Sequence, residues 1–101
     1  MDLLKVLSNS KSKFDRDVKP AFSRDPDSFV AKMEMGNVLD YLLAHAEAIG
    51  RYHSGPSLVE QSQKMRETLV SDGTPKSTDY NIFNLLLNQT RLSVEIGNVF
   101  D

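Results

Sequence analysis

The chain has 101 residues, of which 40% are hydrophobic, and a formal net charge of -2 at pH 7. This size fits one small globular domain, residues 1–101, which buries only about two-thirds of its extended-chain surface, so self-association or a partner would add stability. The lack of cysteine excludes disulfides and thiolate chemistry, and the near balance of 12 Lys+Arg with 14 Asp+Glu argues against nucleic-acid binding. No apolar run approaches the roughly 20 residues of a membrane span, and the N-terminus lacks a Sec-type signal. We therefore expect a protein made in the cytoplasm, with export by a specialised secretion system left open.

Four segments of helix-forming composition are separated by clusters of Gly, Pro, Ser and Asp. These clusters lie at 25–28, 53–57 and 71–77. Between them Leu, Ala, Met, Glu, Lys and Gln dominate, and the alternation typical of β-strands is scarce. The pattern predicts an all-α domain, a small bundle of three to four helices at about 2–22, 28–49, 56–71 and 78–99.

The first two segments carry apolar residues at helical spacing. The helix-poor stretch SNSKS at 8–12 predicts a break, a frayed turn or a late start in the first helix. In the second, Asp27 or Ser28 is expected to cap the helix after Pro26, and Gly50 to end it in a left-handed conformation. The apolar face of the first segment consists of Leu3, Leu4, Leu7, Phe14, Val18 and Phe22.

The third segment has a narrow apolar stripe, whereas the fourth is apolar around more than one face. Ser54 is expected to cap the third helix, with Pro56 in its first turn, and the narrow stripe predicts an outer position. The run LLL at 85–87 widens the apolar surface of the fourth helix. Such a helix has to be buried on two sides, either at the centre of the bundle or against another molecule. We predict a partner-binding face formed by Tyr80, Phe83, Leu86, Leu87 and Val94.

A seven-residue pattern, ExGNVxD, occurs at 34–40 and again at 95–101. Glycine inside a helix costs about 1 kcal/mol relative to alanine, and close approach of a neighbouring helix is the usual reason for it. The two copies predict that the second and fourth helices cross, with Gly36 and Gly97 at the contact and Asn37 and Asn98 hydrogen-bonding across it. Chance duplication of common residue types is the alternative.

No pattern in the chain predicts catalysis, a metal site or a cofactor. The two histidines, His45 and His53, lack the compact i, i+4 spacing of a zinc-ligand pair. The carboxylates alternate with Lys and Arg, as they do on solvated helix faces, and no serine lies in a GxSxG-type sequence. We expect a protein that is not an enzyme and has no cofactor.

The last quarter of the chain resembles the C-terminal helix of the inner-rod and needle subunits that polymerise inside type III secretion machines. It reads STDYNIFNLLLNQTRLSVEIGNVF. An acidic residue and a tyrosine open the helix, and an apolar–aromatic pair, a Thr–Arg pair and β-branched residues follow, at Asp79, Tyr80, Ile82, Phe83, Thr90, Arg91, Val94, Ile96 and Val99. The chain departs from that family in its foldable N-terminal half, 3–49, and in its final Asp101. The resemblance implies a polymerising secretion subunit.

The leading functional prediction is a non-catalytic protein that self-associates or binds a partner through its last helix, because the apolar width of 80–99 exceeds what so short a chain covers. The first alternative is a small regulatory or inhibitory adaptor, of the kind phages and plasmids encode, that docks on a host protein. The second alternative is a helical nucleic-acid-binding protein that uses Lys11, Lys13, Arg16, Lys19 and Arg24.

Overall fold

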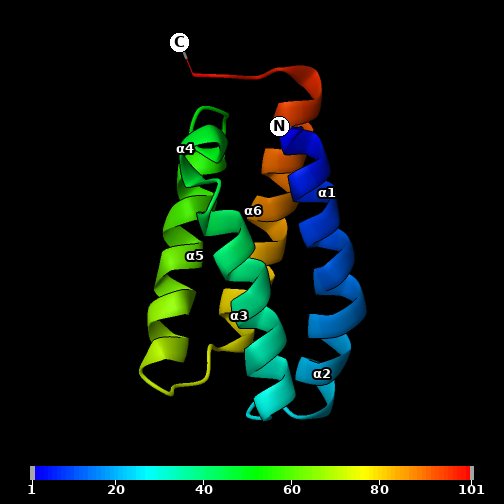
Figure 1. Ribbon diagram of the computed structural model, residues 1–101, viewed down its shortest axis with the longest axis vertical. Coiled ribbons are helices and arrows are strands. Elements are labelled where there is room, and N and C mark those ends of the chain that lie inside the picture. The colour runs from blue at the N-terminus through cyan, green and yellow to red at the C-terminus, as the bar shows by residue number, and fades with distance from the viewer. Residues whose placement is uncertain (1, 101) are drawn as a thin grey trace.

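The N-terminal arm is one helical rod made of three differently wound segments. The computed structural model describes residues 2–100, and in it α1 (Leu3–Lys13) leads into a π-helical segment, η1 (Phe14–Val18), and then into α2 (Lys19–Arg24) (Figure 1). The break predicted at 8–12 is wrong, because α1 runs through this stretch and the buried hydroxyl of Ser10 donates to the Val6 carbonyl at 2.9 Å. The irregular winding comes just before Pro20, which has no N–H to donate to the preceding turn.

The second predicted helix is present but divided. It forms α3 (Phe29–Leu43) and the short α4 (Ala46–Ile49), separated at Ala44–His45, where the His45 N–H bonds to the Leu42 carbonyl at 2.9 Å in a tighter turn. Ser28 caps α3 as predicted, because its hydroxyl accepts from the Ala31 N–H at 3.1 Å. Gly50 ends α4 with a right-handed φ of -65°, so the left-handed terminus predicted there is wrong.

The third and fourth predicted helices are α5 (Gly55–Val70) and α6 (Ser77–Ile96). Ser54 precedes α5 but does not cap it: its φ is 70°, and its hydroxyl donates to Gln89 Oε1 on α6 at 3.3 Å. The Asp79 carboxylate closes the start of α6 by accepting from the Lys76 N–H at 3.1 Å. At the other end Gly97 adopts a left-handed φ of 73°, which stops α6 before the predicted residue 99.

The helices form a four-cornered all-α bundle around one hydrophobic core. The α1 rod packs against α6 and α3, and α5 packs against the same two helices from the other side, which places α6 and α3 at opposite corners (Figure 1). Helix α5 buries Leu58 and Met65, so it is a full member of the bundle rather than an outer layer. The core consists of Leu7, Phe14, Val18, Met35, Val38, Leu39, Leu42, Ile49, Leu58, Met65, Tyr80, Phe83 and Leu87.

After α6 the chain turns back across the end of the bundle towards α4 (Figure 1). The His53 N–H bonds to the Asn98 carbonyl at 3.0 Å, and the Phe100 N–H bonds to the Arg51 carbonyl at 2.9 Å. Tyr52 and Val99 form an isolated bridge, and residues 2–100 contain no strand. No helix within that range has both the length and the apolar character needed to cross a bilayer.

Candidate functional site

The inner face of α6 is part of the protein's own core. Tyr80, Phe83 and Leu87 are only 4%, 0% and 0% exposed, and the Phe83 ring lies 5.3 Å from the ring of Phe14 on the N-terminal rod. Leu86 and Val94 are partly buried and pack against the same core. The expectation that Tyr80, Phe83 and Leu87 are available to a partner is therefore wrong, because α1 and α5 pack on this side of α6 and Phe14 of η1 contacts it.

A second apolar row, which we call the outer stripe, runs along the opposite side of α6. Its large aliphatic members Ile82, Leu85, Leu92 and Ile96 are 45%, 56%, 53% and 74% exposed, and Gln89 completes the row. Each position of the stripe lies two residues after a position of the inner face, which is a rotation of about 200° around the helix. The outer stripe is thus the part of the wide apolar surface that no other helix within residues 2–100 covers.

Along most of the outer stripe, helix α6 itself carries almost no charge. Helix α6 occupies a corner of the bundle, with the α1 rod on one side and α5 on the other, so its stripe faces away from both. From Asn81 to Val94 the only charged residue is Arg91. A surface helix of a globular protein ordinarily carries charged residues on its outward face, so α6 lacks the composition of a helix that faces water.

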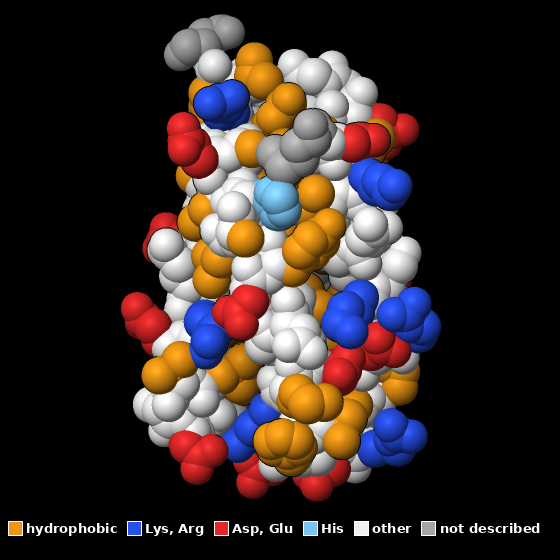
Figure 2. Space-filling view, in the orientation of Figure 1, with side chains coloured by type: hydrophobic (Ala, Val, Ile, Leu, Met, Phe, Trp, Pro, Cys, Tyr) orange, Lys and Arg blue, Asp and Glu red, His pale blue; other side chains and the backbone are white. Residues whose placement is uncertain are grey.

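A smaller apolar cluster lies at the start of α3, where Figure 2 shows hydrophobic side chains gathered at the lower end of the molecule. It comprises Phe29, Val30 and Met33, which are 77%, 50% and 43% exposed. This cluster covers little more than one helical turn. The outer stripe of α6 extends over four turns, which makes it the longer of the two exposed apolar surfaces.

Three of the five basic residues predicted as a nucleic-acid-binding set form ion pairs within residues 2–100. Lys11 lies 3.0 Å from Asp15, Lys13 lies 2.9 Å from Glu34, and Arg16 lies 3.0 Å from Asp17. The hydrogen bond from Arg16, together with the one from Lys13, lowers the pKa of the Asp17 carboxyl to about 2. Figure 2 likewise shows Lys and Arg interspersed with Asp and Glu rather than gathered on this face. Such compensated charge offers little attraction to a phosphate backbone.

The two glycines of the repeated ExGNVxD pattern have different surroundings. Gly36 lies inside α3, where an added Cβ would lie 3.9 Å from Leu69 Cδ1 of α5. Gly97 ends α6 in a left-handed conformation with nothing within 4 Å of such a Cβ. Asn37 and Asn98 are both exposed. The predicted crossing of the two copies is wrong, because α3 and α6 sit at opposite corners and Gly97 is a helix terminus.

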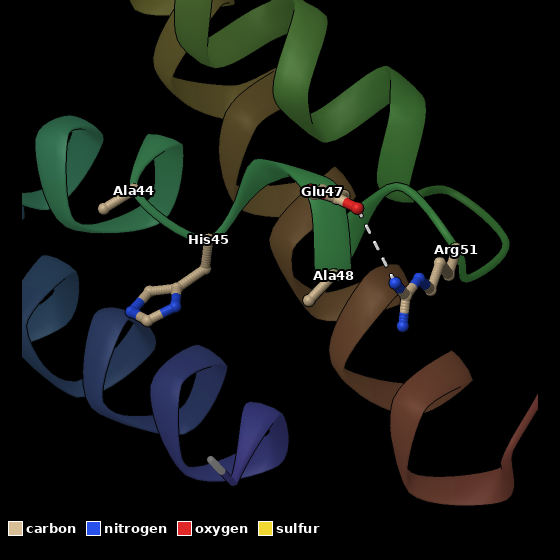
Figure 3. A pocket seen from close by; sticks show the side chains of 5 residues that line it. All are labelled: Ala44, His45, Glu47, Ala48 and Arg51. Carbon is tan, nitrogen blue, oxygen red and sulfur yellow. Dashed lines mark ion pairs between the residues drawn. The ribbon is translucent and has the colours of Figure 1, made fainter.

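Figure 3 shows the shallow pocket beside α4, which includes one of the two histidines. His45 packs edge-on against Tyr41 with 5.4 Å between ring centroids, and Glu47 lies 3.7 Å from Arg51 in an exposed ion pair. Across residues 2–100, no three side chains of the metal-binding types come together. The pocket presents neither a nucleophile with an adjacent base nor a set of metal ligands.

A more enclosed cavity of about 170 Å³ lies between the N-terminal rod and α6. Phe14, Phe22 and Tyr80 form its aromatic lining, with the Phe22 and Tyr80 rings 4.0 Å apart, and Lys19 and Asn84 are among its polar lining residues. The buried Tyr80 hydroxyl has no hydrogen-bond partner among residues 2–100, and burial raises its pKa to about 12. This environment keeps the phenol neutral at physiological pH and unsuited to act as a base.

Comparisons of the chain with protein-family models, with curated proteins and with solved structures found no match. A functional assignment therefore rests on the chain's own surfaces. The outer stripe of α6 is the surface on which the described residues depart furthest from an ordinary water-facing helix.

Proposed function

We propose that this protein is a non-catalytic interaction subunit that self-associates through the outer stripe of α6. The observation that carries the proposal is the exposure of Ile82, Leu85, Leu92 and Ile96 in one row on a helix whose inner face is already buried. Removing apolar surface from water contributes roughly 25 cal/mol per Å², so covering this row favours association. Folding of the single chain does not need the row, because α6 is held by Phe83 and Leu87.

A finer proposal is that the subunit polymerises, as the resemblance to secretion rod and needle subunits implies. The resemblance is supported by the arrangement of α5 and α6 as a hairpin, with Pro75 in the connecting turn. A polymer requires two different surfaces on each copy, because one self-complementary surface closes into a dimer. The cluster of Phe29, Val30 and Met33 at the far corner of the bundle is the candidate for that second surface.

Sedimentation equilibrium over a wide concentration range tests the main proposal. Wild-type protein is compared with Leu92→Asp, which places a charge on the outer stripe, and with Val70→Asp as the matched control. Val70 is also an exposed aliphatic residue, 70% accessible, but it lies at the end of α5. Circular dichroism confirms that all three proteins keep the same helix content.

The expected result is that the mass of the wild type and of Val70→Asp rises with concentration, while Leu92→Asp stays monomeric. A wild type that remains monomeric throughout would overturn the proposal. Association of Leu92→Asp as strong as that of the wild type would also contradict it. Growth beyond a dimer that Met33→Asp abolishes would support the finer proposal of a polymer.

A further inference from the structure

We infer that the occupant of the outer stripe is a second copy of the same helix, bound parallel and in register as a short two-stranded coiled coil. The inference rests on the proposed function and specifies the partner and its orientation. The stripe has the spacing 3, 4, 3, 4 along α6, which is the alternation of a and d positions in a heptad repeat. Its successive layers are Ile82, Leu85, Gln89, Leu92 and Ile96.

The residue types in these layers favour two parallel strands. Ile82 and Ile96 occupy a positions, and Leu85 and Leu92 occupy d positions. β-branched residues at a combined with leucine at d favour parallel dimers, whereas isoleucine at d shifts the preference towards trimers and tetramers. The inner face of α6 has the same spacing but carries Tyr80, Phe83 and Thr90. The heptad pattern of a dimer is therefore specific to the exposed side.

Gln89 supports the parallel orientation and sets the register. In a parallel pair each a residue faces the same a residue, so the two Gln89 amides meet and can bond to each other. An antiparallel pair matches a with d and would place the Gln89 amide against a leucine, where burial of an unpaired polar group is costly. In the single chain Gln89 Oε1 already accepts from the Ser54 hydroxyl at 3.3 Å, and its amide N–H groups remain to donate across the pair.

The positions that flank the stripe fit an identical partner. Asn81, Asn88 and Glu95 lie on one side, and Leu86 and Ser93 lie on the other. Coiled coils that choose a different partner use charged residues at these e and g positions. The only charged residue among these five is Glu95, and in a parallel pair the e position that it faces is residue 100, a phenylalanine, so two copies meet without a like-charge contact between e and g positions although each chain carries a net charge of -2.

The stripe is short, so the dimer is expected to be weak. From Ile82 to Ile96 the helix rises about 21 Å, and interfaces much below the standard size of roughly 1,600 Å² form transient complexes. Association is therefore expected to depend on concentration. Covalent cross-linking reports the orientation of the two helices, which a measured affinity does not.

Cysteine cross-linking tests the orientation. The natural chain has no cysteine, so Ile82→Cys, Leu92→Cys and Ile96→Cys each contain a single thiol. Each variant is oxidised alone and then in pairwise mixtures in which one partner carries a mass tag. Glu67→Cys, on the exposed face of α5, measures cross-linking by random collision. A disulfide requires Cα atoms within about 7 Å, a distance that only facing layers reach.

The parallel register predicts that each stripe variant cross-links to its own kind several-fold faster than Glu67→Cys, and that mixtures of residue 82 with 92 or 96 give no mixed product. Mixed products without self-products would overturn the parallel orientation while leaving the proposed self-association in place. If the wild type associates but no stripe variant or mixture cross-links faster than Glu67→Cys, the outer stripe is not the contact surface. A wild type that never associates would remove the proposed function itself.

Discussion

The two sides of α6 have the same spacing of apolar residues, but one side is buried and the other is exposed. The inner face places Phe83 and Leu87 against the N-terminal rod and α5 with no exposed area. The outer stripe, shifted by two residues, places Leu85 and Leu92 in water with more than half of each side chain exposed. Hydrophobic periodicity therefore identifies the apolar faces of a helix. Which of these faces is buried depends on where the other helices of the chain pack.

The largest expected difference between the two faces of α6 is in stability, when one leucine of each face is truncated to alanine. Leu87→Ala is expected to lower the free energy of unfolding by about 2–5 kcal/mol, because it leaves a cavity in the core. Leu85→Ala should change the stability of the dilute monomer by less than about 0.5 kcal/mol, because its side chain is exposed. Urea unfolding at low protein concentration measures both, and equal losses would contradict the distinction.

Gly97, which ends α6, and Gly36, its counterpart in the α3 copy of the repeated pattern, should respond in opposite ways to substitution by alanine. Gly97→Ala is expected to destabilise by about 1 kcal/mol, because the φ of 73° is unfavourable for any residue with a Cβ. Gly36→Ala should stabilise by up to about 1 kcal/mol, because alanine favours the helix and its Cβ would meet Leu69 at an ordinary 3.9 Å. Thermal unfolding compares the two, and changes of the same sign would show that the copies share a role.

The ionisation of Tyr80 reports on the burial of the inner face of α6. Burial raises its pKa to about 12, so its contribution to stability is fully present below the ordinary tyrosine pKa of about 10 and is lost as the pH rises through 12. Ultraviolet titration should show one of the three tyrosines ionising late, and Tyr80→Phe should abolish that late step. Because the hydroxyl has no partner within the described part of the chain, Tyr80→Phe should change stability at neutral pH by at most about 1 kcal/mol. Retention of the late step in Tyr80→Phe would assign it to another residue.

The smallest effect is expected away from α6, at the charged surface of η1. The pKa of Asp17 is about 2, below the ordinary value, so its stabilising contribution is present above about pH 4 and is lost as the pH falls through 2. Asp17→Asn should flatten this part of the acid unfolding profile, and added salt should reduce the difference from the wild type, because the pair is solvent-accessible. An unchanged profile would mean that the Arg16–Asp17 pair does not stabilise the fold.

The sequence was sufficient to predict the all-α class and the approximate position of each helix, because periodicity and caps such as Ser28 are local features. It did not predict the break at Ala44–His45, since no Gly or Pro marks it. Nor did it separate the two sides of α6. Both apolar rows have the same spacing, and only contact with Phe14, some seventy residues away in sequence, decides that Phe83 rather than Leu85 lies inside.

An amide chemical-shift dilution series by nuclear magnetic resonance tests the central claim most directly. If the outer stripe binds a second copy, concentration-dependent shifts should concentrate on the amides of Ile82, Leu85, Gln89, Leu92 and Ile96, and the surface of α3 around Phe29 should change less. Shifts that are absent at every concentration, or that centre on Phe29, Val30 and Met33 instead, would contradict the account.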